Sequence, residues 1–269
     1  MTIRYGISLA SLLPWSMQSW FWPWGSPTRA ARWAKEAGYE FLQVLPFRGT
    51  TGREQYDLPV LYKEGAWNAA FGLCQVLRHQ LGAAGMPSGP LDLVFFPDPL
   101  TCRRVVKGWK ARFISHSFKM HRMLVEICPE LEMTSQEIAA KCEIDNIQLV
   151  LDTEHLVRDR RPFDSNFGKK PHPFFPGVNL SEGEMPDFGA IRAAIEPMAH
   201  HIVVIHVKSV APGTIDRQII SALMDSPDRR DHLDAVAEYK PPRNTLFNLW
   251  AARRYMADFL HDMRVCIEG

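Results

Sequence analysis

Four polar residues at or near the ends of short apolar segments are the part of this sequence best suited to chemistry. The clearest case is the apolar segment 149–151, which ends at Asp152 and is followed three residues later by His155. On a strand followed by a turn, this spacing lets the Asp152 carboxylate and the His155 imidazole converge just beyond the strand. Oxygen and nitrogen ligands of this kind suit Zn²⁺, Mn²⁺, Fe²⁺ or Co²⁺. The spacing therefore predicts a site for a divalent metal.

Three other apolar segments carry a polar residue in the same way. Glu126 lies within one run, and His206 and Glu268 each end another. The carboxyl ends of parallel strands in a barrel meet on one face, so these side chains would lie together there. The alternatives are a buried core histidine for His206 and a solvated terminal residue for Glu268. We predict four metal ligands, which are Glu126, Asp152, His206 and Glu268.

A metal held in this way predicts proton transfer next to a carbonyl group. An ion that binds a hydroxyl and a neighbouring carbonyl polarises that carbonyl and acidifies the adjacent C–H bond. A carboxylate on each face of the carbon could then remove and return the proton. Glu126 and Glu268 come from well-separated segments and are the predicted catalytic pair.

Several side chains near these ligands are candidates for binding a substrate. Lys208 follows His206 by two residues and would point to the same end of the strand. Arg158, with two further arginines, could bind a phosphate or carboxylate, or could be part of a solvated loop. Trp15 and three other tryptophans could wall a pocket for a sugar, or form an apolar lid or a subunit contact. The predicted substrate contacts are His155, Lys208, Trp15 and Arg158, and His116 is a weaker candidate for a second metal ion.

These groups need parallel strands to bring them together, and the chain opens with a βαβ pattern. Segments 4–9 and 40–45 are predicted strands, and between them Pro27–Ala37 is a predicted helix that ends at Gly38. A capping-box-like sequence begins at Thr134. Further predicted strands are 91–96, 112–116, 123–128, 148–152, 202–207 and 264–268, and further predicted helices are 66–83, 102–110, 134–142, 190–198 and 246–261.

About eight strands that mostly alternate with helices predict a (β/α)₈ TIM barrel, as one domain over residues 1–269. A doubly wound open sheet is the rival, but no glycine-rich phosphate motif follows the first strand. The chain ends directly after its last predicted strand, so the barrel would be irregular and lack its last outer helix. The uncovered seam after Glu268 in turn predicts self-association into a homo-oligomer.

Composition narrows the partners. The chain has 269 residues, 46% of them hydrophobic, and a net charge of +1, which gives no general attraction to a nucleic acid. No segment is long enough to span a bilayer, so no membrane partner is expected. Five scattered cysteines without a CxxC pair indicate reduced thiols, and we expect a cytoplasmic protein.

These residues resemble the xylose isomerase-like barrel superfamily, which includes sugar phosphate isomerases and epimerases and endonuclease IV. The resemblance is specific mainly at 151–155 and 205–208. It implies that the strand Glu, the Asp of DxxH, the next strand's His and the last strand's Glu bind a divalent metal, with His155 near the substrate or a second metal. The sequence departs from the pattern at Gln43, where a Glu is usual, and at Ser209, where an Asp is usual.

The favoured function is therefore a metal-dependent isomerase or epimerase of a sugar or related hydroxy-carbonyl compound. An endonuclease IV-like phosphodiesterase is the first alternative, but it needs more histidine ligands, and Asp231 and His232 have the wrong spacing for its DxH pair. The second alternative is a barrel that has lost catalysis and serves as a binding subunit. Metal content separates this last hypothesis from the other two.

Overall fold

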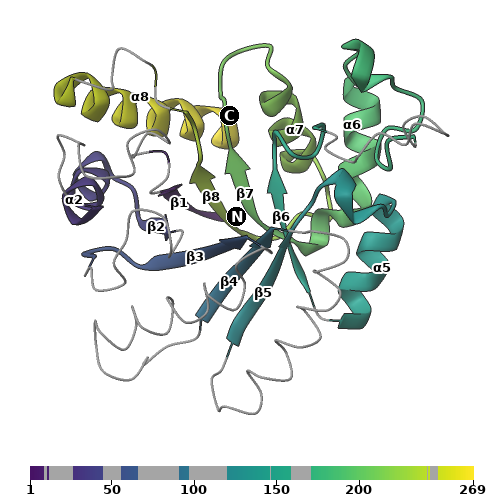
Figure 1. The fold of residues 1–269 in the computed structure, drawn as a ribbon, viewed down its shortest axis with the longest axis horizontal. Coiled ribbons are helices and arrows are strands. Elements are labelled where there is room, and N and C mark those ends of the chain that lie inside the picture. The colour runs from purple at the N-terminus through teal and green to yellow at the C-terminus, as the bar shows by residue number, and fades with distance from the viewer. Residues whose placement is uncertain are drawn as a thin grey trace.

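The computed structural model shows a barrel of parallel strands. It describes residues 1–8, 11, 27–44, 56–65, 91–96, 120–145, 147–158, 171–240, 242 and 248–269. Each strand pairs in parallel with the next along the chain, and β8 also pairs with β1, which closes the sheet (Figure 1). The strands are β1 (Thr2–Ser8), β2 (Phe41–Val44), β3 (Val60–Gly65), β4 (Leu91–Phe96), β5 (Met120–Glu126), β6 (Gln148–Asp152), β7 (Ile202–Val207) and β8 (His232–Ala237).

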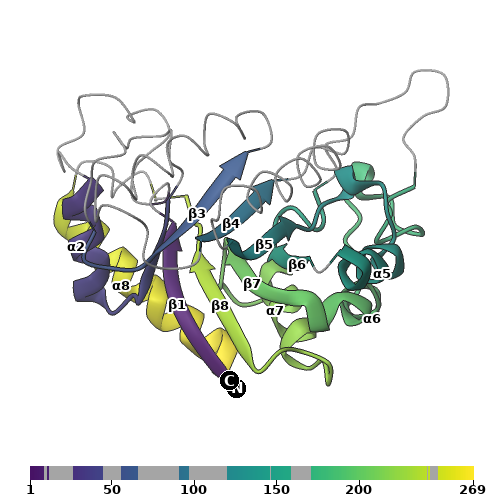
Figure 2. The same cartoon turned by 90° about the horizontal axis from the view of Figure 1, so that it is seen from below.

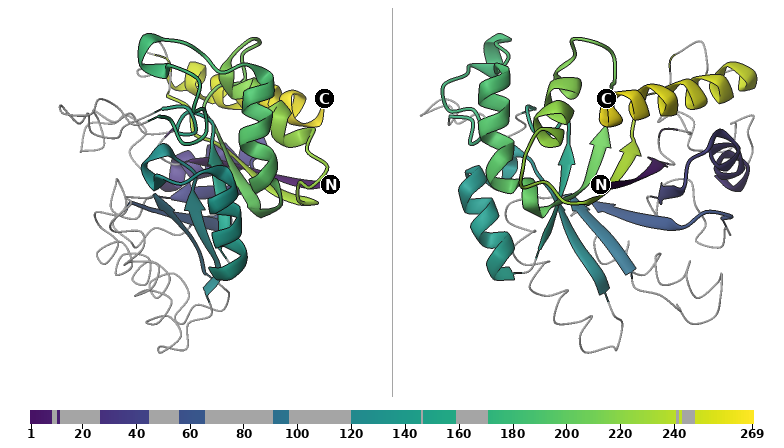
Figure 3. Two further views of the ribbon diagram at one scale, coloured as in Figure 1. Left: turned by 90° about the vertical axis from the view of Figure 1, so that its right-hand side faces the viewer. Right: turned by 180° about the vertical axis from the view of Figure 1, so that it is seen from behind.

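Helices lie outside this sheet, as Figures 1 and 3 show. The last helix, α8, packs against β8, α2 and α7, and α7 packs against α6. The helices are α2 (Pro27–Ala37), α5 (Ser135–Asp145), α6 (Phe188–Ile195), α7 (Ile215–Met224) and α8 (Leu249–Glu268), and the 3₁₀ turns are η3 (Pro129–Leu131), η4 (Leu180–Glu182) and η5 (Glu196–His201). Among the described residues, none of these helices combines the length and the apolar character needed to cross a bilayer.

Two apolar cores hold the barrel and its helices together. The larger core includes the outward faces of the strands and the inward faces of the helices. The smaller one fills the interior of the barrel and consists of Phe41, Leu61, Leu124, Val150, Val203, Val204 and Val236. Since successive side chains of a strand alternate between faces, the residues two positions beyond Phe41, Leu124, Val150, Val204 and Val236 also face the interior.

Near the amino ends of the strands, an ion pair joins β1 to β8. The guanidinium group of Arg4 donates two hydrogen bonds of 2.8 Å to the carboxylate of Asp234, which is buried. The same guanidinium group lies over the ring of Phe41, 5.3 Å from its centroid. A buried carboxylate is tolerated in the middle of a strand when it is paired in this way.

Several predicted elements are confirmed with the predicted bounds. The strands 91–96, 148–152 and 202–207 and the helix Pro27–Ala37 are found where the sequence predicts them. At the start of α5, the backbone N–H and the hydroxyl of Thr134 both donate to Glu137, which confirms the capping box. The predicted segments 66–83, 102–110 and 112–116 lie outside the described residues.

The end of the chain differs from the prediction. Segment 264–268 is not a strand, because it continues α8 to Glu268, and the last strand is β8. Helix α8 buries Met256, Phe259 and Met263 toward the barrel, with Leu260 and Ile267 on the same face. This spacing of three and four residues is helical. The last outer helix is therefore present, and the predicted uncovered seam, with its argument for self-association, is wrong.

Candidate metal centre at the carboxyl ends of the strands

A layer of polar side chains lies directly beyond the apolar interior of the barrel, at the carboxyl ends of the strands. At five strands, an apolar residue of the interior is followed two positions later by a polar residue, which lies in the strand or directly after it and shares its face. The pairs are Phe41 and Gln43, Leu124 and Glu126, Val150 and Asp152, Val204 and His206, and Val236 and Glu238. All of these polar side chains except Glu238 are fully buried, and Glu238 is partly exposed. The alternation of the strands thus gathers three carboxyl groups, an imidazole and an amide on one face.

The two carboxylate oxygens of Asp152 have different partners. Its Oδ1 accepts hydrogen bonds of 2.9 Å from the backbone N–H groups of Glu154 and His155, which holds the turn after β6. Its Oδ2 faces the interior, 2.9 Å from Lys208 Nζ and 3.5 Å from His206 Nδ1. The DxxH spacing works because the turn that Asp152 holds also returns His155 toward it.

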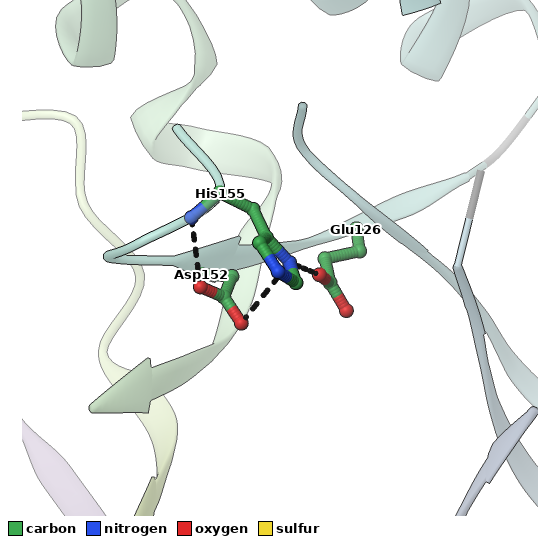
Figure 4. A group of neighbouring side chains, drawn as sticks. All are labelled: Glu126, Asp152 and His155. Carbon is green, nitrogen blue, oxygen red and sulfur yellow. Dashed lines mark hydrogen bonds and ion pairs between the residues drawn. The ribbon is translucent and has the colours of Figure 1, made fainter. Parts of the chain in front are cut away.

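His155 completes the first half of the site. Its Nδ1 forms a hydrogen bond with Glu126 Oε1 and lies 3.4 Å from Asp152 Oδ2 (Figure 4). Glu126 comes from the end of β5 and Asp152 from the end of β6, and these strands are neighbours in the barrel. The predicted convergence of Asp152 and His155 is therefore present, with Glu126 as a third member.

His206 occupies the centre of the group. Its Nδ1 lies 3.2 Å from Glu238 Oε2, 3.5 Å from Asp152 Oδ2 and 3.7 Å from Glu126 Oε2. Its other ring nitrogen, Nε2, lies 2.6 Å from Gln43 Oε1. One edge of the ring thus faces three carboxyl groups, and the other faces a neutral amide.

Lys208 adds a positive charge to the same face. Its Nζ lies 2.9 Å from Asp152 Oδ2 and 2.8 Å from Glu238 Oε2. Burial would lower the pKa of Lys208, but the charges of Glu238 and Asp152 outweigh this effect and raise it. Burial would likewise raise the pKa of Asp152, but the nearby His206 ring and the charge of Lys208 hold it well below its usual value. Both groups are therefore charged at neutral pH.

The donor atoms are suited to a divalent metal ion. Two groups of candidate ligands share Asp152, and within each group the donor atoms lie within 4.8 Å of one another. The groups are Glu126, Asp152 and His155, and Asp152, His206 and Glu238. Ligands on one ion with bonds of about 2.0–2.2 Å lie about 3.0–3.5 Å apart, which is close to the distances around His206 Nδ1. The set of carboxylate oxygens and imidazole nitrogen fits Mn²⁺, Zn²⁺, Co²⁺ or Fe²⁺.

Glu238, which the sequence reasoning missed, stands where Glu268 was predicted. Glu268 is the last residue of α8, and its Oε1 accepts a hydrogen bond of 2.6 Å from the hydroxyl of Tyr5. In Figure 2 both chain ends lie toward the end of the barrel where β1 begins, which is opposite the carboxyl ends of the strands. Glu238 directly follows β8. The apolar residues Ala235, Val236 and Ala237 before it are the same signal that identified Asp152.

Of the other two predicted substrate contacts, Arg158 and Trp15, only Arg158 lies within the described residues. Arg158 is exposed and forms an ion pair of 2.6 Å with Glu154, one helical turn away. Trp15 and His116 lie outside the described residues. The structure therefore brings His155 and Lys208 to the site and pairs Arg158 with a surface carboxylate beside it.

A hydrogen-bonded bridge beneath the site was also not predicted. The Thr153 hydroxyl donates to Asp216 Oδ1 at the start of α7, and its oxygen faces the backbone N–H of Lys208 at 3.4 Å. Burial raises the pKa of Asp216. This bridge ties the turn that carries Asp152 to the segment that carries Lys208, and both to α7.

Comparisons with known proteins support the architecture. Neither the known family models nor the curated proteins gave a match to this sequence. Among solved structures, D-allulose 3-epimerase from Methylomonas sp. in complex with D-allulose matches with a TM-score of 0.54 and 13% identity, over 97% of this chain and 96% of that one. The same enzyme with additional C-terminal residues matches with a TM-score of 0.56 and 13% identity, over 98% of both chains. At this identity the likeness concerns the fold, and it agrees with the resemblance to xylose isomerase-like barrels.

Proposed function

We propose that this protein is a divalent-metal-dependent isomerase or epimerase of a sugar or a related hydroxy-carbonyl compound. The observation that carries the proposal is the polar layer itself, in which Glu126, Asp152 and Glu238 surround His206 at the carboxyl ends of neighbouring strands. Active sites of parallel barrels lie at this end. The nearly full-length likeness to an epimerase of a ketose adds support from the fold.

The residues that would hold the ion are Glu126, Asp152, His206 and Glu238. When bound there, the ion would supply Lewis acidity, which polarises a substrate carbonyl and acidifies the neighbouring C–H bond. As in the family that the sequence resembles, the last strand would contribute a carboxylate, but the residue would be Glu238 rather than Glu268.

The two glutamates are suited to proton transfer. Glu126 Oε2 and Glu238 Oε2 both lie within 3.7 Å of His206 Nδ1, and they come from β5 and from the end of β8. One carboxylate would take the proton from the carbon next to the carbonyl, and the other would return one. Inversion at that carbon results when the two act from opposite faces.

His155 and Lys208 would support this chemistry from the sides. The hydrogen bond from the His155 ring orients the Glu126 carboxylate, and so fixes the direction from which it approaches the substrate. The Lys208 ammonium lies between Asp152 and Glu238, where it would attract a substrate oxygen that gains negative charge.

Deuterium incorporation tests the proposal whichever product the reaction forms. The protein with Mn²⁺ would be incubated with ketoses such as D-allulose in D₂O, and the carbon next to the carbonyl would be examined by NMR. We expect deuterium at that carbon, its loss in Glu238→Gln, and its retention in the matched control Glu268→Gln. Absence of exchange with any ketose by the metal-loaded protein would contradict the proposal. Hydrolysis of a phosphodiester with two or three ions per chain would favour the endonuclease IV-like alternative.

A further inference from the structure

Gln43 is the neighbour of His206 on the side away from the carboxyl groups. Its Oε1 lies 2.6 Å from His206 Nε2, and both side chains are fully buried. Gln43 comes from β2 and His206 from β7, so the contact crosses the interior of the barrel. In the part of the chain that the structure describes, Gln43 Nε2 has no hydrogen-bond partner. The contact with His206 is therefore the interaction that orients this amide.

The orientation of the amide decides where His206 carries its proton. A neutral imidazole has one protonated nitrogen and one with a lone pair. An amide oxygen against Nε2 requires the proton on Nε2, and Nδ1 then has the lone pair. An amide nitrogen in the same place would require the lone pair on Nε2, and the proton would face the carboxyl groups.

Only the first arrangement lets His206 bind a cation between the carboxylates. Nδ1 is the ring atom that lies 3.2 Å from Glu238 Oε2 and 3.5 Å from Asp152 Oδ2. A proton at this position would occupy the space of the ion and repel it.

We propose that Gln43 is a positioning residue that selects the Nε2–H tautomer of His206 and thereby makes Nδ1 available as a metal ligand. The inference rests on the metal site of the proposed function. Removal of such a hydrogen-bond partner from a metal-ligating histidine typically weakens metal binding by about 10–100-fold.

Metal titration of three variants tests this role. Gln43→Leu removes the acceptor and keeps an apolar side chain of similar size, whereas Gln43→Glu keeps the acceptor. Gln148→Leu is the matched control, since it is the same change in a barrel strand, at the opposite end of β6 from Asp152. By calorimetric titration with Mn²⁺ or Zn²⁺, we expect Gln43→Leu to bind about 10–100-fold more weakly. Gln43→Glu and Gln148→Leu should stay close to the wild-type affinity.

A second readout follows the tautomer itself and needs no metal. In protein labelled with ¹⁵N-histidine, long-range ¹H–¹⁵N spectra distinguish a protonated ring nitrogen from one with a lone pair. We expect Nε2–H for His206 in the wild type and in Gln43→Glu. In Gln43→Leu the proton should move to Nδ1, where Glu238 and Asp152 accept it.

The two readouts separate the inference from the function on which it rests. A wild type that binds no ion would contradict the proposed function, and the spectra of the metal-free protein would still test the tautomer. A wild-type His206 without a proton on Nε2, or equal metal affinity in wild type and Gln43→Leu, would overturn the role of Gln43.

Discussion

The different partners of the two Asp152 oxygens give a prediction that separates folding from metal binding. Asp152→Asn keeps an oxygen that can accept from the backbone N–H groups of Glu154 and His155, and replaces the oxygen that faces Lys208 with an NH₂ group. Asp152→Ala removes both. Both variants should lose the metal, but only Asp152→Ala should also lose the turn after β6.

The magnitudes follow from the contacts. In Asp152→Asn, Lys208 retains Glu238 at 2.8 Å, so the loss is that of one hydrogen bond to a charged group, about 2 kcal/mol. Asp152→Ala also loses the contact with Lys208 and in addition leaves two backbone N–H groups without their acceptor, at about 1–3 kcal/mol each when buried, for a total of about 5 kcal/mol. For a chain of this size, a loss of 1 kcal/mol lowers the melting temperature by about 2–4 °C. The melting temperature should therefore fall by about 4–8 °C in Asp152→Asn and by about 10–20 °C in Asp152→Ala.

Thermal unfolding in the presence of a chelator measures the loss of stability, and titration with Mn²⁺ measures the loss of metal binding. Equal melting temperatures for the Asn and Ala variants would refute the structural role of Oδ1. Wild-type metal affinity in Asp152→Asn would refute the assignment of Oδ2 to the ion.

Three further predictions concern the barrel around the site. Gly6→Ala should lower the free energy of unfolding by about 1–3 kcal/mol in urea titrations, because a Cβ there would collide with the Phe41 ring inside the barrel; an unchanged midpoint would contradict this packing. The lowered pKa of Asp152 contributes stability that is present above its unfolded pKa and lost as the pH falls below about 5. Wild-type unfolding free energy should therefore fall more steeply from pH 5 to pH 3 than that of Asp152→Asn, and parallel curves would refute the shift. Burial, and then the hydrogen bond and charge of Glu268, raise the pKa of Tyr5, so Glu268→Gln should move its ultraviolet titration to lower pH and leave metal affinity unchanged.

Local sequence patterns were sufficient for the part of the site that depends on one strand and its turn. The apolar segment before Asp152 predicts β6, and the DxxH spacing predicts the return of His155 because the aspartate holds its own turn. His206 and Glu126 follow from the same pattern, since a strand of alternating faces places its last inward side chain in the polar layer at the carboxyl ends of the strands. The capping box at Thr134 is equally local.

The parts that the sequence reasoning missed depend on contacts between distant segments. Strand β8 contains Asp234 in its middle, and only the distant Arg4 makes that carboxylate acceptable inside the sheet. Because the sequence pattern does not predict β8, it gives no strand that Glu238 could follow. The short apolar run before Glu268 instead predicts a strand, although its spacing continues the helical pattern of Met263 and Met256. Strand β3 was missed because Lys63 and Glu64 interrupt its apolar pattern.

Gln43 shows a different limit. In the sequence, Gln43 is only a departure from a usual Glu, because nothing in its local pattern indicates its neighbour. Its role depends on a contact with His206 across the barrel, 163 positions along the chain. Closure of the sheet between β1 and β8 is what brings β2 and β7 to face each other.

The most direct test of the metal centre is the number of ions bound per chain in the wild type, Glu238→Gln and Glu268→Gln, measured by elemental mass spectrometry after loading with Mn²⁺ and removal of free ion. We expect the wild type and Glu268→Gln to retain the same bound ion, and Glu238→Gln to lose it. A wild type without bound ion, or loss of the ion in Glu268→Gln rather than in Glu238→Gln, would contradict a metal centre built on Glu126, Asp152, His206 and Glu238.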